Sequence, residues 1–214
     1  MGFPVYDFRT DVRNILVTPQ IRSRFLRMEP GQTSAGHTHD LGHEIFLILS
    51  GRCEFTIDGE SEVLGPGQMC VALVDQMHSV RVVGDEPMTM YLSVTPHIQP
   101  THTFWLADGV KDAPRFAPHS AYDIDVDTSI TNDELLQQHV DAAQTVAATA
   151  QTFAKAQEEQ AAVYQRAMGQ GDVAAATAAR AAMWDALSAL HSQLFSLDDN
   201  WNELAPRLID GKPA

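Results

Sequence analysis

Residues 14–94 form a series of short apolar segments, each about the length of a β-strand and separated by turn residues. Segments such as EIFLILS, RCEFTI and QMCVAL follow one another, with PG, SG, DG, GPG and GD between segments. Strands at such regular spacing are typical of an all-β sandwich or barrel. The Asp58-Gly59 pair between CEFTI and ESEVL favours a tight hairpin, because both residues tolerate positive φ. The pattern therefore predicts a double-sheet jelly roll.

One stretch of this series, GQTSAGHTHDLGHEIFLILSG over residues 31–51, carries side chains that bind metals. Side chains alternate in extended backbone, so His37 and His39 should point to the same side and can share one ion. Glu44 opens the next apolar run and can add a carboxylate oxygen. Downstream, His78 begins another alternating segment and is the fourth candidate. We predict a metal site made of these four residues, with a metal-free structural barrel as the alternative.

The order and spacing of these residues resemble the cupin superfamily. Every fixed position of its first motif is matched, by Gly31, His37, His39, Glu44 and Gly51. In its second motif, which aligns on Gly67 and His78, the chain departs at the positions of Pro, Gly and Asn: Leu73, Asp75 and Val82. These are turn and strand-end positions, so the resemblance implies that the ligand set is kept. It also implies a mainly β fold, the cupin double-stranded β-helix or jelly-roll barrel.

Further side chains near the predicted site leave alternatives open. His43 stands beside the candidate carboxylate ligand and, by strand alternation, points away from it, which favours a surface or supporting role. Arg22 and Arg24 share one face of IRSRFLRM. They are candidate substrate-binding residues for an anion if that face is interior, and solvent-facing charges otherwise. His97 and His102 follow the last expected strand, where either can line the barrel mouth, but we expect solvated loop histidines.

The C-terminal part changes to helical periodicity. Thr131 and Glu134 form a capping box that opens a long helix, and Gly169-Gln-Gly171 is expected to end it. A second helix carries a stripe of large apolar side chains before Pro206: Met183, Leu187, Leu190, Leu194, Leu197, Trp201 and Leu204. We therefore divide the chain into a cupin β-barrel at 1–105, a connector at 106–130 and a C-terminal antiparallel α-helical hairpin at 131–214.

The stripe on the second helix needs a cover, because the small alanines of the first helix cannot enclose it. We expect a homodimer or a higher homo-oligomer to supply that cover. Docking of the hairpin on its own barrel, as a lid, and binding of a dedicated partner are the alternatives.

Composition limits the other partners. The 214 residues carry a formal net charge of −14, which speaks against binding nucleic acid or an anionic membrane surface. No apolar run approaches membrane-spanning length and the N-terminus lacks the pattern of a signal peptide, so we expect a cytoplasmic protein. Cys53 and Cys70 lie in strand-like segments, where we expect them to act as small buried hydrophobes.

The resemblance implies one divalent transition metal ion, Fe, Mn, Ni, Cu, Co or Zn, among which the donor set does not choose. It favours a metal-dependent enzyme that acts on a small organic substrate, with oxygenase-type chemistry ahead of isomerase or lyase chemistry. The sequence does not identify the catalytic residues. The alternative is a non-catalytic metal-binding or small-ligand-binding module whose helical hairpin serves as an oligomerisation or interaction element.

Overall fold

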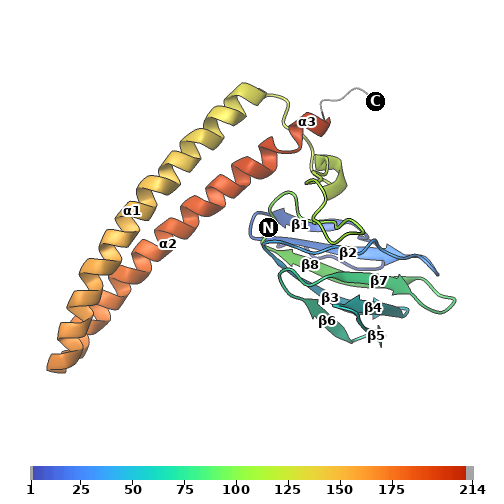
Figure 1. The fold of residues 1–214 in the computed structure, drawn as a ribbon, viewed down its shortest axis with the longest axis horizontal. Helices are drawn as coiled ribbons and strands as arrows, with labels where there is room; N and C mark the ends of the chain where they lie inside the picture. The colour runs from blue at the N-terminus through green and yellow to red at the C-terminus, as the bar shows by residue number, and fades with distance from the viewer. Residues whose placement is uncertain (1, 211–214) are drawn as a thin grey trace. The chain divides into compact units, whose positions relative to one another are not determined.

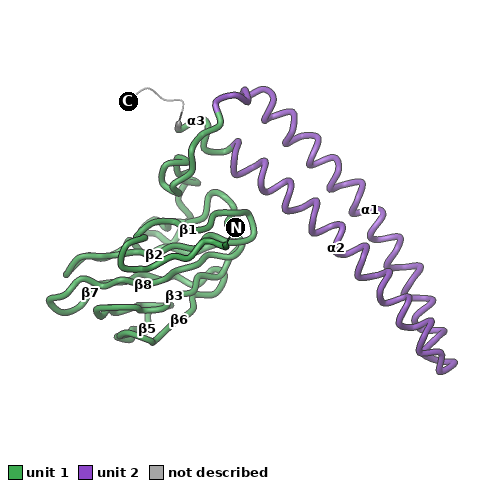
Figure 2. The backbone as a smooth tube through the Cα atoms, turned by 180° about the vertical axis from the view of Figure 1, so that it is seen from behind, with its two compact units in different colours: residues 1–127, 205–214 green, residues 128–204 purple. Residues whose placement is uncertain are grey.

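The computed structural model describes residues 2–210 and divides them into two compact units. Within that range, unit 1 holds residues 2–127 and 205–210, and unit 2 holds residues 128–204 (Figure 2). Met1 and residues 211–214, the two ends of the expected barrel and hairpin regions, lie outside the described residues.

Unit 1 is built from β-strands in two antiparallel sheets (Figure 1). The larger sheet has the order β1-β2-β8-β3-β6 and the smaller one β5-β4-β7. The strands are β1 (Asn14–Thr18), β2 (Ile21–Met28), β3 (His43–Ser50), β4 (Cys53–Ile57), β5 (Glu60–Leu64), β6 (Met69–Ala72), β7 (His78–Val82) and β8 (Met88–Thr95). The predicted two-sheet, all-β architecture is confirmed.

Register across the larger sheet arranges its inward side chains in rows that change from charged to apolar. The first row contains Arg22, Val94 and Glu44, the second Arg24, Leu92 and Phe46, and the third Leu26, Met90 and Ile48. In the smaller sheet, the matching pairs are His78 with Ile57, Val80 with Phe55 and Val82 with Cys53. The apolar side chains of the second and third rows belong to the core or pack against it. The first row carries Arg22 and Glu44, and the second adds Arg24. The interior therefore has one polar end.

Two tight connections hold the strands in this register. Asp58 and Gly59 have φ values of 49° and 86° and join β4 to β5, as expected for the predicted hairpin. Gly51, between β3 and β4, has a φ of 69°, and a Cβ built there would lie 2.4 Å from the carbonyl oxygen of Pro87. Only glycine fits this turn without movement of the neighbouring backbone.

Residues 96–127 pack on the strands of unit 1. Thr38 and Thr103 form an isolated antiparallel bridge, and the short 3-10 helix η1 (His119–Tyr122) buries His119 and Tyr122. The backbone and side-chain nitrogens of Asn14 both donate to Asp123, each at 2.8 Å. The helix α3 (Arg207–Asp210) belongs to the same unit, and Arg207 donates to the carbonyl oxygen of Asp127.

Unit 2 consists of the two long helices α1 (Asn132–Gln170) and α2 (Val173–Leu204), which lie side by side (Figures 1 and 2). The predicted capping box is present: Thr131 Oγ1 accepts from the Glu134 amide while Glu134 accepts from the Thr131 amide. The first helix continues through Gly169 and ends at Gly171, whose φ of 70° suits a helix C-cap. Gln157 on α1 donates to the Met183 carbonyl on α2 at 2.8 Å.

Unit 2 buries few side chains for its length. Across both helices the buried residues are Leu135, Ala167, Ala176 and Ala179. Members of the apolar stripe such as Leu187, Leu190 and Leu194 are half-buried, and Trp184 is 64% exposed. In the part of the chain that the structure describes, no helix is long and apolar enough to cross a membrane.

Candidate metal centre

The four predicted metal-binding residues meet at the polar end of unit 1. Glu44 is the second residue of β3 and His78 is the first of β7, so neighbouring ends of the two sheets supply them. His37 and His39 lie in the extended segment between β2 and β3, which is held by a bridge between His37 and His78. Alternation still holds there, since Thr38 points away and accepts from Trp105 Nε1.

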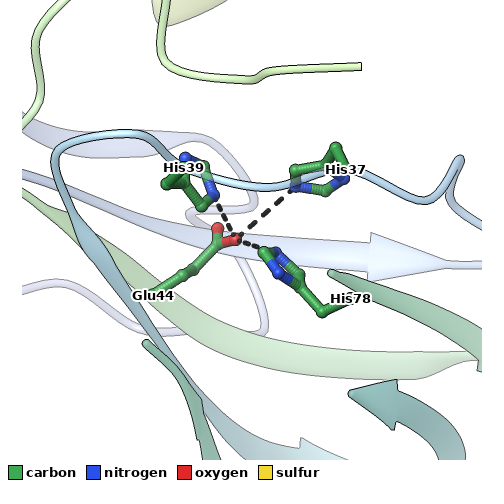
Figure 3. Close-up of side chains that lie close together, drawn as sticks. All are labelled: His37, His39, Glu44 and His78. Atoms are coloured by element: carbon green, nitrogen blue, oxygen red, sulfur yellow. Dashed lines mark hydrogen bonds and ion pairs between the residues drawn. The ribbon is translucent and has the colours of Figure 1, made fainter. Parts of the chain in front are cut away.

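The donor atoms of these residues converge on one point (Figure 3). The Oε2 atom of Glu44 lies 2.9 Å from His39 Nε2, 3.1 Å from His78 Nε2 and 3.8 Å from His37 Nε2. One potential ligand atom from each residue lies within 4.8 Å of all the others. His39, Glu44 and His78 are buried and His37 is half-buried.

Backbone carbonyls fix the orientation of all three imidazole rings. His37 Nδ1 is 2.9 Å from the Ala35 oxygen, His78 Nδ1 is 2.9 Å from the Gln76 oxygen, and His39 Nδ1 contacts the Thr101 oxygen. A carbonyl oxygen only accepts, so each Nδ1 carries a proton. In the neutral ring, each Nε2 then presents a lone pair toward Glu44, the tautomer that metal-binding histidines use.

The carboxylate of Glu44 is strongly favoured in its ionised form. Burial on its own would raise its pKa, but the three histidine rings that face the carboxylate outweigh burial and hold the pKa well below the usual value. Its other oxygen, Oε1, lies 3.8 Å from the guanidinium of Arg22. The site therefore combines a buried anion with three imidazole nitrogens aimed at it.

Both candidate arginines face the interior, so the solvent-facing alternative is wrong for Arg22 and Arg24. Arg22 is buried, its guanidinium lies 5.3 Å from the centre of the Tyr122 ring, and Arg24 is half-buried in the next row. The two side chains and Glu44 line a cavity of about 170 Å³. Its other lining residues include His37, His78, His102, Leu92 and Phe55.

His43 lies outside the cluster. Its side chain is exposed, and its Nδ1 accepts a hydrogen bond from the Val74 amide at 3.0 Å. The outward direction follows from its place next to Glu44 on β3, as strand alternation predicts.

The interpretation of His97 and His102 as solvated loop residues is wrong. His97 is 2% exposed, and burial and the nearby Arg22 charge lower its pKa to about 3. His102 lines the cavity with its ring centre 4.6 Å from that of His37. Burial and the neighbouring His37 and His39 lower the pKa of His102 to about 2, so the ring is neutral. The bridge between Thr103 and Thr38 brings this segment over the site, and no local pattern in the sequence predicts such a bridge.

The aromatic pair after His102 also contacts the site. The Phe104 ring centre lies 6.1 Å from that of His37, and the Arg115 guanidinium lies 4.6 Å from the centre of the Phe104 ring. Trp105 holds Thr38 by a hydrogen bond of 3.1 Å, so it fixes the segment that carries the two histidines.

The loop before His78 explains how the second motif can depart from its pattern. Asp75 stands where the pattern has glycine and has a φ of 62°, a conformation that aspartate tolerates better than most residues. Its amide donates to the His39 carbonyl at 3.0 Å, so the loop also supports the first motif. Val82, in place of asparagine, joins the apolar core.

Comparison with known proteins agrees with this architecture. Residues 24–95 match the family model described as the cupin domain, so this part of the chain is a cupin domain. A curated relative, the polyketide synthase CurC of Streptomyces cyaneus, is 33% identical over 91 residues, which are 40% of this chain and 59% of the relative. The match thus spans less than two thirds of that relative's length.

Two solved structures show partial likeness to this chain. A conserved double-stranded β-helix protein from Klebsiella pneumoniae is 24% identical, with a TM-score of 0.42 over 44% of this chain and 91% of the other. The TT1209 protein from Thermus thermophilus is 19% identical, with a TM-score of 0.41 over 43% of this chain and 96% of the other.

Proposed function

We propose that the cupin domain holds one divalent transition metal ion through His37, His39, Glu44 and His78. We further propose that it is a metal-dependent enzyme acting on a small organic substrate, with oxygenase-type chemistry favoured. Fe, Mn, Ni, Cu, Co and Zn are all compatible with three imidazole nitrogens and one carboxylate.

The orientation of the imidazole rings is the observation that carries this proposal. Lone pairs of three neutral rings facing an ionised carboxylate repel one another, so the arrangement needs a cation at its centre. Protons can supply that charge only by making neighbouring rings cationic, and one carboxylate oxygen is a poor acceptor for three such donors. His37 Nε2 in fact has no hydrogen-bond partner among the described residues. A single divalent ion would satisfy all four donors at once.

The cavity beside the cluster favours catalysis over a closed structural site. A bound divalent ion supplies Lewis acidity and open coordination positions for water, dioxygen or a substrate oxygen. His37, Glu44 and His78 all border the cavity, so a substrate there would reach the ion directly. The apolar side chains of the second row limit access of water. The curated relative is named a polyketide synthase, and polyketides are oxygen-rich molecules of the kind that such a site could bind.

Metal analysis of the full-length protein tests the metal site. We expect about one transition metal ion per chain and a sharp loss of metal in His78→Ala and in the His37→Ala/His78→Ala double variant, because each change removes a donor atom. His43→Ala is the matched control and should keep its metal. Unchanged metal content in the double variant would refute the ligand assignment. Oxygen-consumption assays with small acids, phenols and thiols would then test oxygenase chemistry.

The alternative function is a non-catalytic binding module whose helices mediate assembly. Because unit 2 buries few of its side chains, its helices favour assembly with another surface. We propose that α1 and α2 form an antiparallel hairpin and that a second copy of the chain covers the half-buried stripe, giving a homodimer or a higher homo-oligomer. This assembly is compatible with either a catalytic or a non-catalytic cupin domain, so the oxygen-consumption assays, and not metal content, decide between the two.

A further inference from the structure

The cavity carries more positive charge than the proposed metal ligands explain. Of its lining residues, Arg22 and Arg24 are cationic and Glu44 is the only acid. With neutral histidines, the lining has a net charge of +1 before any metal binds, and a divalent ion would raise it to +3. Buried charge of one sign is costly unless an opposite charge joins it.

The two guanidinium groups are incompletely satisfied. The Nε atoms of Arg22 and Arg24 are both buried without a hydrogen-bond partner among the described residues. Arg22 is partly engaged, since it lies 3.8 Å from Glu44 and against the Tyr122 ring. Among the described residues Arg24 makes no comparable close contact. Burial and the nearby Arg22 charge lower its pKa, while the charges of Asp123 and Glu44 act in the opposite direction without a close ion pair.

The row arrangement gives the cavity two chemically different ends. Arg24 occupies the second row beside Leu92 and Phe46, one row below Arg22 and Glu44. Phe55 and Val80 face it from the smaller sheet and also line the cavity. A ligand in this space would therefore meet a cation and apolar side chains together.

We propose that this cavity binds a small organic anion, whose carboxylate or enolate oxygens pair with the guanidinium of Arg24 while its apolar part lies against Leu92 and Phe55. This inference names the substrate class of the proposed metal-dependent enzyme and rests on that function. Arginine suits the task because its planar donors match two oxygens of one anion.

Binding of matched carboxylate and amide probes tests the inference. Titration calorimetry on the full-length protein would compare propionate with propionamide and benzoate with benzamide, because each pair differs mainly in charge. At least one carboxylate should bind tenfold or more tightly than its amide. Arg24→Met should weaken that binding at least tenfold and leave metal content unchanged, and Arg24→Lys should restore part of it. Arg27→Met is the matched control, since Arg27 is exposed on the same strand and pairs with Glu29.

The outcomes separate this inference from the proposed function. Equal affinity for carboxylates and amides, or unchanged carboxylate affinity in both Arg24→Met and Arg24→Gln, would overturn the anion site. The titrations are repeated on zinc-loaded and on chelator-treated protein. If the metal analysis fails but Arg24-dependent carboxylate binding persists in the chelated protein, the anion site stands and the metal-dependent function falls. If metal binds as expected but the Arg24 substitutions leave carboxylate affinity unchanged, the metal-dependent function stands and the anion site falls.

Discussion

The two units of this protein differ in how completely they bury their apolar side chains. Unit 1 encloses an apolar core of side chains such as Ile48, Met88 and Met90 and places titratable groups at one end of it. Unit 2 extends two long helices that bury four residues between them. The strands of unit 1 thus complete their own core, whereas the helices leave an apolar stripe half-covered. Stability and chemistry are therefore expected to depend on unit 1 and assembly on unit 2.

The largest expected effect is a loss of stability of unit 1 when a single methyl group is added at Gly51. Gly51→Ala places a Cβ 2.4 Å from the Pro87 oxygen and forces alanine to a φ of 69°. Such strain and overpacking should lower the free energy of unfolding of unit 1 by about 2–5 kcal/mol. Thermal unfolding of the metal-loaded protein measures the loss.

Gly169→Ala in α1 is the contrasting substitution. A Cβ there meets nothing within 4 Å, so alanine should stabilise the helix by up to about 1 kcal/mol. Equal stability of the Gly51→Ala variant and the parent protein would show that the turn between β3 and β4 can rearrange, and that unit 1 is less tightly specified than its register indicates.

Lowering the pH should affect the two units differently. In the metal-free site, burial on its own lowers the pKa of His78, but the hydrogen bonds to Glu44 and to the Gln76 carbonyl outweigh it and raise the pKa. A metal ion must displace that proton, so metal affinity should be greatest above the raised pKa and fall by about tenfold per pH unit below it for each proton released. Competition with a chelator from pH 8 to pH 5.5 measures this slope.

The helical signal in circular dichroism should stay constant over the same pH range, because the proposed proton-linked site lies in unit 1. Metal affinity independent of pH would contradict histidine ligation. A parallel loss of helix would contradict the independence of the two units.

The comparison also shows how far sequence alone reaches. Strand alternation and turn residues predicted the two sheets and the Asp58-Gly59 hairpin, and together with the motif resemblance they predicted the convergence of His37, His39, Glu44 and His78. The positions of His97 and His102 were not predictable, because they depend on long-range backbone contacts: the His97 amide donates to the Pro19 carbonyl, and Thr103 pairs with Thr38, 65 positions earlier in the chain. Likewise, no local pattern in the sequence shows whether Arg22 and Arg24 face the interior or the solvent. Only the register between β2, β8 and β3 places Arg22 beside Glu44.

Assembly should be lost when the stripe of unit 2 is made polar. The double substitution Leu190→Gln/Leu194→Gln removes apolar surface from two half-buried positions, and each such side chain contributes about 1.5–3 kcal/mol when fully buried. We expect the proposed oligomer to dissociate in light scattering, with metal content unchanged. Trp184→Gln is a control at a 64% exposed position of the same helix. A parent protein that is already monomeric would exclude the second copy as the cover of the stripe and make unit 2 a candidate lid for the cavity.

The smallest expected effect concerns the start of α1. Thr131→Ala removes the hydroxyl that accepts from the Glu134 amide and should cost unit 2 about 1 kcal/mol, with amide exchange accelerated over residues 132–135. Thr145→Ala removes a hydroxyl that bonds back to the Asp141 carbonyl within the same helix and should be neutral or stabilising, because alanine is the better helix former. Equal effects of the two substitutions would show that the capping box does not determine where the helix begins. Altered metal content in Thr131→Ala would reveal coupling between the units that their separate cores do not predict.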